Sequence, residues 1–313
     1  MNAYLIKQDP ITLIDCGVYG FNSKLALVEQ LCQQGLELKD IRRILITHAH
    51  PDHYGLAAEI QRISGASVYM HPREAIKARG HLKNLQRIAS FAVFAGLPEE
   101  FHIPLEEHNK WEASFVQPPA EIVEIDNGHI FLFEGGEIEG VLTPGHAVGH
   151  MSYYQKEGGL LFSGDTVLGK IIPNPVLEPS PDGKLDREKS LIQYINSINA
   201  LRKLKINQIL PGHGSPIPDP LSAFKRVDIL YQERKAEVKK IAYLRGDFNL
   251  FEVAIELYRN IKRPVDYYLA MSEMLGYLDI LEAEGTVIQQ QTPAGITYTY
   301  SINSQNHIEI VQS

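Results

Sequence analysis

Four side chains that can bind a metal ion stand within six residues of one another. They are His48, His50, Asp52 and His53, in the run His48-Ala49-His50-Pro51-Asp52-His53. Imidazole nitrogens and carboxylate oxygens are the ligands that a divalent cation such as Zn²⁺ prefers. Because four ligands exceed the share of one tetrahedral site from so short a segment, the spacing allows two ligands for each of two metal ions.

Three more potential ligands follow, each beside a glycine at the end of a short apolar segment. They are His146 after Gly145, Asp165 after Gly164 and His213 after Gly212. Glycine lets the backbone turn sharply or come close to a site. A structural role is the alternative for each residue alone, but the repeated placement of a ligand after a strand favours a metal site.

The elements that must position these residues alternate between short apolar strands and helices, which predicts an α/β domain. His48 follows one of the strands directly, where side chains leave the sheet edge and can converge in a cleft. The predicted strands cover residues 3–7, 11–14, 43–47, 66–70, 122–125, 129–133, 138–142, 152–154, 160–163 and 208–210, and the helices 23–34, 56–64 and 187–203. In the first helix, we expect the apolar side to consist of Leu25, Leu27, Val28 and Leu31.

Two segments depart from this alternation. Residues 73–117 form a mainly helical insertion rich in Phe and Trp, whose aromatic side chains we expect in the core, with some lining a pocket for an apolar acyl group. The prolines between Pro216 and Pro220 forbid regular structure and mark a domain boundary, which gives domains 1–219 and 220–313. The second domain is predicted to hold helices at 221–244, 250–258 and 264–283 and a terminal β-hairpin.

The ordered series of ligand residues, together with Asp15, resembles the motif set of the metallo-β-lactamase superfamily over residues 2–214. The resemblance implies a four-layer αβ/βα sandwich with a binuclear metal site at one edge. It also implies that His48, His50 and His146 bind one metal, that Asp52, His53 and His213 bind the second, and that Asp165 bridges both. Asp15 would orient the ligand loop by hydrogen bonds.

This resemblance implies a hydrolase, and Zn²⁺ is the metal that we expect at both positions. Two such ions lower the pKa of a shared water, supply a bridging hydroxide and polarise the attacked carbonyl oxygen. Asp52 is the predicted catalytic residue that moves a proton, with a role as ligand only as its alternative. Enzymes of the commonest penicillin-cleaving subclass have cysteine in place of Asp165, which counts against antibiotic hydrolysis.

The C-terminal domain resembles a winged-helix-like appendage of some superfamily members, including relatives of an endoribonuclease. From Leu221 onward, ten basic residues stand against twelve acidic ones, and the cluster of Arg234, Lys235, Lys239 and Lys240 alternates with Glu233 and Glu237. A nucleic-acid surface needs clustered positive charge, so this tail is predicted to serve packing, to close a lid or to form a homodimer.

Composition narrows the class of protein further. The 313 residues carry a net charge of −8 and two cysteines, which excludes a disulfide framework and gives no general attraction to nucleic acid or anionic membranes. No apolar run approaches the ~18 residues of a membrane span. We therefore expect a cytoplasmic protein with a small-molecule substrate.

Three functions remain open at this stage. The first is zinc-dependent cleavage of a small ester, thioester or lactone, as in the hydroxyacylglutathione hydrolases and acyl-homoserine lactonases that the chain resembles. The second is a phosphodiesterase or ribonuclease that uses the same centre. The third is a diiron redox protein, which the lack of a flavodoxin-like second domain disfavours. A non-enzymatic binding module would leave the intact ligand set unexplained.

Overall fold

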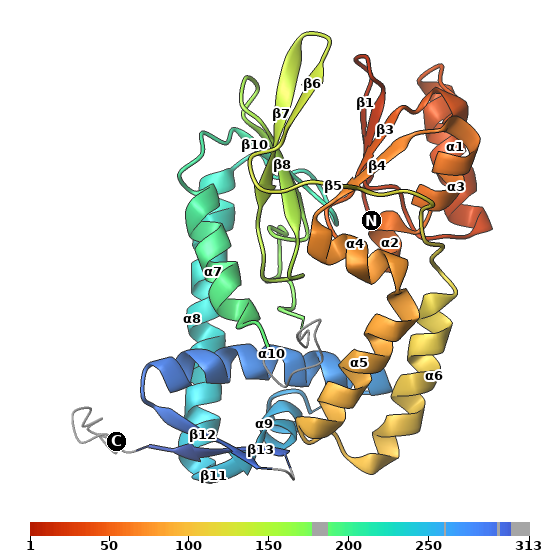
Figure 1. The fold of residues 1–313 in the computed structure, drawn as a ribbon. Helices are drawn as coiled ribbons and strands as arrows, with labels where there is room; N and C mark the ends of the chain where they lie inside the picture. Colours follow the sequence, from red (N-terminus) through yellow and green to blue (C-terminus); the bar gives the residue numbers. More distant parts are fainter. Residues whose placement is uncertain (177–186, 260, 293–294, 302–313) are drawn as a thin grey trace.

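Two five-stranded sheets lie face to face in the computed structural model, which describes residues 1–176, 187–259, 261–292 and 295–301 (Figure 1). In spatial order, the first contains β1 (Tyr4–Ile6), β2 (Thr12–Ile14), β3 (Arg43–Leu45), β4 (Ser67–Met70) and β5 (Val123–Glu124). The second contains β10 (Gln208–Pro211), β9 (Leu160–Gly164), β8 (Met151–Gln155), β7 (Gly136–Leu142) and β6 (Ile130–Phe133).

Side-chain alternation along the strands produces four layers, because successive residues point to opposite faces of a sheet. In β3, Ile44 packs toward α1 (Phe21–Gln33) and α3 (Ala57–Ser64), whereas Leu45 packs toward the opposite sheet. In β8, Tyr153 faces the first sheet, whereas Tyr154 joins the core under α7 (Ser190–Leu201) and α8 (Pro220–Arg245). The order is therefore helix, sheet, sheet, helix, as predicted.

Within each sheet, the strands that lead to the candidate ligands run in parallel. β2, β3, β4 and β5 are parallel neighbours, and β9 pairs in parallel with β10. β7 is also parallel to β9, because each pairs antiparallel with β8 between them. The carboxyl ends of these strands therefore meet at one edge of the sandwich.

The predicted helical segment at residues 73–117 forms α4 (Pro72–Arg79), α5 (His81–Phe94) and α6 (His102–Ala113), with the short η2 (Glu99–Phe101) before α6. Two further short elements, η1 (Leu38–Asp40) and α2 (Pro51–Tyr54), lie in the first layer. α5 and α6 pack side by side (Figure 1), and the Asn109 side chain of α6 donates a hydrogen bond to the Leu85 carbonyl of α5 at 3.1 Å.

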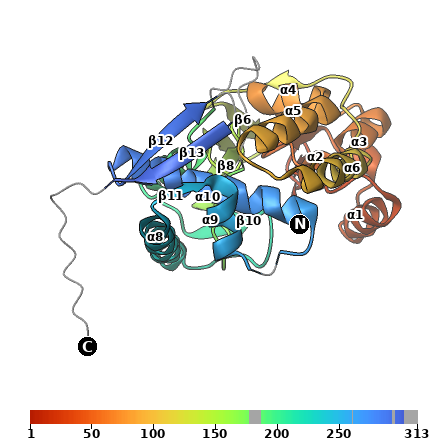
Figure 2. The same ribbon diagram turned by 90° about the horizontal axis from the view of Figure 1, so that it is seen from below.

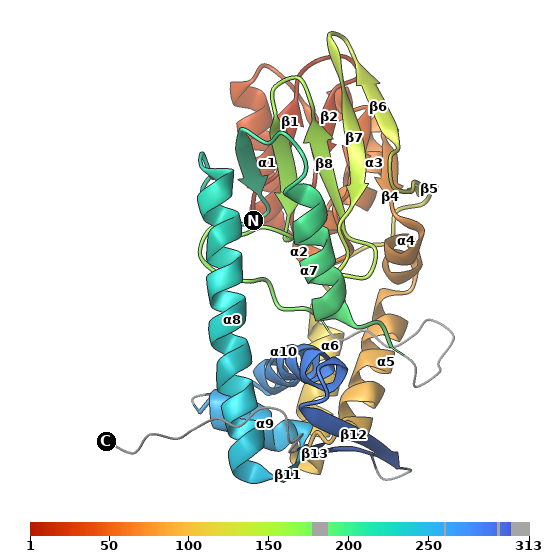
Figure 3. The same ribbon diagram turned by 90° about the vertical axis from the view of Figure 1, so that its left-hand side faces the viewer.

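After α8 come β11 (Asp247–Asn249), α9 (Leu250–Leu257), α10 (Pro264–Ala283), β12 (Val287–Thr292) and β13 (Gly295–Tyr300). The three strands form a small sheet beside α9 and α10 (Figure 2). α8 extends from the second sheet down to this group (Figure 3). One apolar core runs from Leu161 of β9 through Leu191 of α7 to Leu278 of α10. It therefore crosses the predicted boundary at residues 219 and 220.

Two sequence expectations need correction. Leu25 and Val28, predicted on the apolar side of α1, are 44% and 37% exposed, and Leu31 carries the burial of that helix. β11 was not predicted, since three residues are too few to show a strand alternation. Of the predicted hairpin turn, residues 293–294 lie outside the described residues. No helix in the described ranges is long and apolar enough to cross a membrane.

Candidate metal centre

The seven predicted ligand residues all follow strand ends at the same edge of the sandwich. His48, His50, Asp52 and His53 follow β3, and His50 is the last residue before the short helix α2. His146 follows β7, Asp165 follows β9 directly, and His213 follows β10. Residues separated by as many as 165 positions therefore face a common space, as the sequence predicts. The roles of these residues as ligands stay a prediction.

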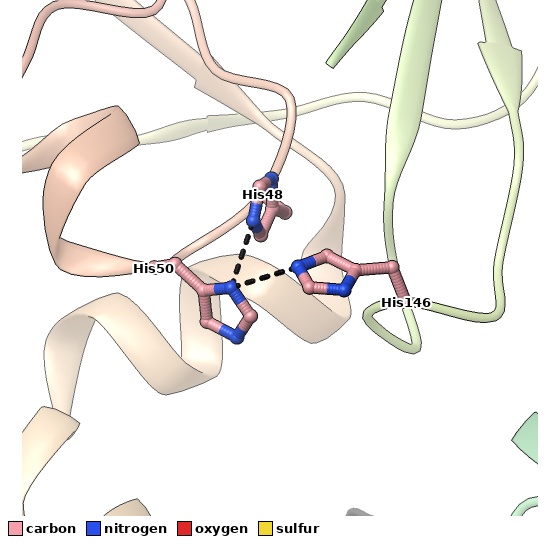
Figure 4. A group of neighbouring side chains, drawn as sticks. All are labelled: His48, His50 and His146. Atoms are coloured by element: carbon pink, nitrogen blue, oxygen red, sulfur yellow. Dashed lines mark hydrogen bonds between the residues drawn. The ribbon is translucent and has the colours of Figure 1, made fainter. Parts of the chain in front are cut away.

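One group of ring nitrogens gathers around His50 (Figure 4). The Nδ1 atom of His50 lies 2.9 Å from Nε2 of His48 and 3.0 Å from Nε2 of His146. Ligands of one tetrahedral ion with metal–nitrogen distances of about 2.0 Å are about 3.3 Å apart, so the three nitrogens are close to the separation that such an ion requires.

A second group surrounds Asp52. Its Oδ2 atom lies 3.1 Å from Nε2 of His213 and 3.6 Å from Nε2 of His53. Asp165 stands between the two groups: its Oδ2 atom is 3.7 Å from Nε2 of His146 and 3.6 Å from Nε2 of His213, and its Oδ1 atom is 3.5 Å from Nε2 of His53. A carboxylate in this position can reach cations on both sides.

In His53 and His146, a hydrogen bond from Nδ1 fixes the ring so that Nε2 faces the centre. His53 donates from Nδ1 to Asp15 at 2.8 Å, and His146 donates from Nδ1 to the Asn174 carbonyl at 2.8 Å. Asp15 also accepts from the backbone N–H and the hydroxyl of Thr47, at 2.8 and 2.9 Å. Asp15 therefore orients the ligand loop, as expected, and such partners fix the tautomer of a ligand histidine.

Two buried atoms of this centre lack a hydrogen-bond partner among the described residues, namely Nε2 of His53 and Oδ1 of Asp165. Buried polar atoms are almost always paired, so each such exception needs an explanation. A cation between them would satisfy both atoms. The donor set therefore fits a metal ion.

Burial and neighbouring charges together shift the pKa values of the histidines. It lowers the pKa of His48, His50 and His146, and the neighbouring histidines lower it further for His48 and His50. These rings are therefore neutral at pH 7, as metal ligands must be. For His53, burial would also lower the pKa, but Asp15 and Asp165 outweigh it and raise the pKa.

For the two carboxylates, contacts with histidines outweigh the effect of burial on the pKa. Burial would raise the pKa of Asp52, but the hydrogen bond from His213 and the charge of His53 outweigh it and lower the pKa. The pKa of Asp165 is lowered in the same way, by its contacts with His53 and His146. Both groups are ionised at neutral pH and suit a cation.

Close backbone approach explains two of the glycines. A side chain on Gly212 would place its Cβ 2.4 Å from Oδ1 of Asp165, and one on Gly164, which has φ of +48°, would place its Cβ 2.6 Å from Nε2 of His150. His150 is itself buried behind the site, where it accepts from the backbone N–H of Asp165 at 3.1 Å and lies 5.0 Å from the His48 ring.

Sequence reasoning missed three residues around the centre. Glu74 is fully buried and accepts from the backbone N–H groups of Ala49 and Gly149, at 2.8 Å each, so that it joins two ligand loops. His81 is buried, and it lies 3.8 Å from a carboxylate oxygen of Glu112, which is the third of these residues. Their spacing carries no signal, because only the packing of α4, α5 and α6 brings them to the site.

Comparison with known proteins agrees with this fold. The profile described as the metallo-beta-lactamase superfamily matches residues 2–213, which is two thirds of the sequence. The chain belongs to the metallo-beta-lactamase superfamily, and it is a hydrolase of that superfamily.

Individual relatives cover more of the chain. The probable metallo-hydrolase YqjP of Bacillus subtilis is 29% identical over 299 residues, which are 91% of this chain and 88% of the relative. A metallo-beta-lactamase family protein from Thermus thermophilus superposes with a TM-score of 0.80 at 27% identity, over 96% of this chain and 93% of that one. Thioesterase pkgB of Emericella nidulans is 33% identical over 117 residues, which are 37% of this chain and 30% of the relative.

Proposed function

We propose that this hydrolase holds two divalent metal ions, with Zn²⁺ at both positions, and cleaves a small ester, thioester or lactone. The observation that carries the proposal is the convergence of five imidazoles and two carboxylates on one space, with buried ligand atoms that have no other partner among the described residues. His48, His50 and His146 would hold one ion; Asp52, His53 and His213 would hold the second; and Asp165 would contact both.

When bound, two such ions lower the pKa of a shared water toward about 7 and polarise the attacked carbonyl oxygen. The residues of the chain provide the rest of the chemistry. Asp52 is ionised and partly exposed, so it can accept a proton from the nucleophile and pass it to the leaving group. Asp15 and Thr47 hold the ligand loop in place while this happens.

The acyl substrate class is supported by an apolar cavity beside the centre and by the thioesterase among the relatives. The phosphodiesterase alternative has less support, because part of the basic cluster of α8 is already paired with carboxylates. Arg234 contacts Glu237 and Glu273, and Lys235 contacts Glu284, which reduces the positive charge that this cluster could offer to a phosphate backbone.

Metal content tests the first half of the proposal. Elemental analysis of the purified protein should give close to two transition-metal ions per chain, with zinc dominant, and removal of the metal by a chelator should abolish hydrolysis. His50→Ala should lose metal and turnover yet keep its circular dichroism spectrum. One ion at full occupancy would contradict a binuclear centre, and reversible iron redox would favour the diiron alternative.

A substrate panel tests the second half. Thioesters, esters, lactones and bis(p-nitrophenyl) phosphate should be assayed side by side on the metal-loaded protein. We expect turnover of carbonyl substrates. Turnover confined to the phosphodiester would replace this proposal with the nuclease alternative.

A further inference from the structure

A cavity of about 480 Å³ opens against the candidate metal centre, with His50, Asp52 and His146 at one end. Its volume falls in the range of about 300 to 1,000 Å³ that is typical of small-molecule sites. Most of the wall residues away from the metal residues come from α5, α6 and α10, and these walls are mainly apolar. The apolar residues include Leu85, Ile88, Trp111, Tyr268 and Leu269, together with Phe115 just after α6.

Polar side chains interrupt these apolar walls, among them Lys77, His81, Asn109, Glu112 and Arg263. His81 lines the cavity and is 7% exposed, yet neither of its ring nitrogens has a hydrogen-bond partner in the part of the chain that the structure describes. The nearest acidic group, Oε1 of Glu112, is 3.8 Å from its Nε2, which is beyond hydrogen-bond distance. Glu112 lines the same cavity, and its other oxygen lies 3.5 Å from Nε2 of His108.

Leaving a buried imidazole unpaired costs free energy, which a ligand with matching polar atoms would recover. Burial and the nearby charge of Lys77 lower the pKa of His81 to about 4, so at pH 7 its ring offers one N–H donor and one lone pair. Burial and the charge of Asp52 raise the pKa of Glu112 to about 7. A hydroxyl is the smallest group that donates to one partner and accepts from the other.

We propose that this cavity binds the acyl part of the substrate and that His81 and Glu112 recognise a hydroxyl group on an otherwise apolar acyl chain. The inference rests on the proposed function, since it names the acyl group that the hydrolase accepts. Apolar walls with a few placed polar groups are the usual basis of specificity in such pockets. A site built to bond a hydroxyl also rejects the analogue that lacks it.

Binding can be measured without hydrolysis, because Trp111 is the single tryptophan of the chain and lines the cavity with 59% of its surface exposed. The metal-loaded protein would be titrated with octanoate and with singly hydroxylated octanoates while Trp111 fluorescence is recorded. We expect at least one hydroxyoctanoate to bind about tenfold tighter than octanoate. Equal affinity for all of them, or no fluorescence response, would overturn the proposal.

Substitutions assign this preference to particular residues. His81→Leu should abolish the preference for the hydroxylated acid, whereas His81→Gln, which keeps a donor and an acceptor, should retain most of it. Glu112→Leu is a second variant with the same expected loss. His102→Leu is the matched control, because His102 begins α6 as His81 begins α5 but bonds the Leu97 carbonyl outside the cavity. A preference that survives in His81→Leu and Glu112→Leu contradicts the proposal.

Parallel assays with octanoyl and hydroxyoctanoyl thioesters separate this inference from the function on which it rests. If neither thioester is hydrolysed but the binding preference depends on His81, the proposed function fails and the subsite stands. If both are hydrolysed at equal rates by the wild type and His81→Leu, and the acids bind equally, the function stands and the subsite fails.

Discussion

Asp52 differs from the buried ligands around it, because its side chain is 42% exposed and borders the cavity. His48 and His53, by comparison, are fully buried. A carboxylate that touches both the ligand group and the open space can hold a nucleophile and still reach a leaving group. Its lowered pKa keeps it ionised and ready to accept a proton.

Asp52→Asn should therefore reduce kcat by about 10²- to 10⁴-fold, the usual contribution of general acid–base catalysis. Steady-state kinetics and elemental analysis on the same preparation check this. If the metal content of the variant equals that of wild type, the decrease in kcat is due to impaired proton transfer. If the variant binds less metal than wild type, Asp52 acts as a ligand only. Asp126→Asn, at a carboxylate that is 81% exposed, is the control and should leave kcat unchanged.

Glu112 gives a pH-dependent prediction for the metal-free protein. Its pKa is raised from 4.5 to about 7 on folding, by burial and then by the charge of Asp52. The folded state therefore binds more protons than the unfolded state between these pH values, so stability is lost as the pH rises from about 4.5 to 7. Glu112→Gln should not show this loss of stability, because glutamine does not titrate.

The difference in unfolding free energy between Glu112→Gln and wild type should therefore shift in favour of the variant by about 1 to 3 kcal/mol as the pH rises from 4.5 to 8. Urea unfolding at both pH values, with the metal removed by a chelator, measures the difference. If the unfolding free energies of wild type and variant change equally between these two pH values, the raised pKa of Glu112 is contradicted.

At the scale of single residues, the sequence predicts side chains that share a short motif or follow a strand beside a glycine. His48, His50 and Asp52 belong to the first kind, and Asp165 to the second. It does not predict His81 and Glu112, because 31 positions separate them and only the pairing of α5 with α6 brings them together. The pairing of helices depends on tertiary packing, of which one sequence carries no direct record.

Among the elements, α10 joins the C-terminal part of the chain to the catalytic edge. The Asn174 side chain donates to the Leu269 carbonyl of α10 at 2.7 Å, and the backbone carbonyl of Asn174 accepts from His146. The Ser272 hydroxyl of α10 donates to the Pro175 carbonyl at 2.9 Å. One hydrogen-bonded loop therefore connects a candidate metal ligand with this helix.

A buried ion pair fixes α10 at a second point. Arg187, which precedes α7, contacts Asp279 of α10 at 2.6 Å, and their side chains are 12% and 2% exposed. Asp279→Ala would leave the guanidinium buried and unpaired, which should destabilise the protein by about 3 to 5 kcal/mol in urea unfolding. Asp266→Ala breaks the exposed pair with Arg263 on the same helix and should cost about 0 to 1 kcal/mol. Equal losses would exclude an anchoring role for Asp279.

Helices and strands with strong periodicity were predicted close to their observed bounds, such as residues 264–283 for α10 and 208–210 for β10. The predicted apolar side of α1 was wrong for Leu25 and Val28, since these residues and the buried Leu31 are equally apolar in a periodicity argument. The winged-helix-like character of the tail and the homodimer stay predictions.

Across the whole molecule, apolar packing is continuous between the second sheet and the C-terminal helices. The ring centroid of Phe101, just before α6, lies 4.3 Å from that of Tyr267 in α10 and 6.0 Å from that of Phe251 in α9. Tyr194 of α7 and Phe224 of α8 belong to the same core. A boundary at residues 219 and 220 would divide this core, so the two parts should not unfold independently.

Calorimetry should accordingly show one cooperative transition for the metal-free chain, with the van't Hoff enthalpy equal to the calorimetric enthalpy. Asp279→Ala should lower the midpoint of this single transition. Two resolved transitions in the wild type would instead establish that residues 220–313 fold as an autonomous domain.

The seven candidate ligands all follow strand ends, in loops or in the short helix α2, whereas the far walls of the cavity come mainly from α5, α6 and α10. Bond cleavage and substrate choice are thereby encoded in separate stretches of the gene. Substitutions in one helical wall therefore need not disturb the candidate ligands, and a mutant library confined to those helices should yield new substrate selectivities while the candidate metal centre stays unchanged.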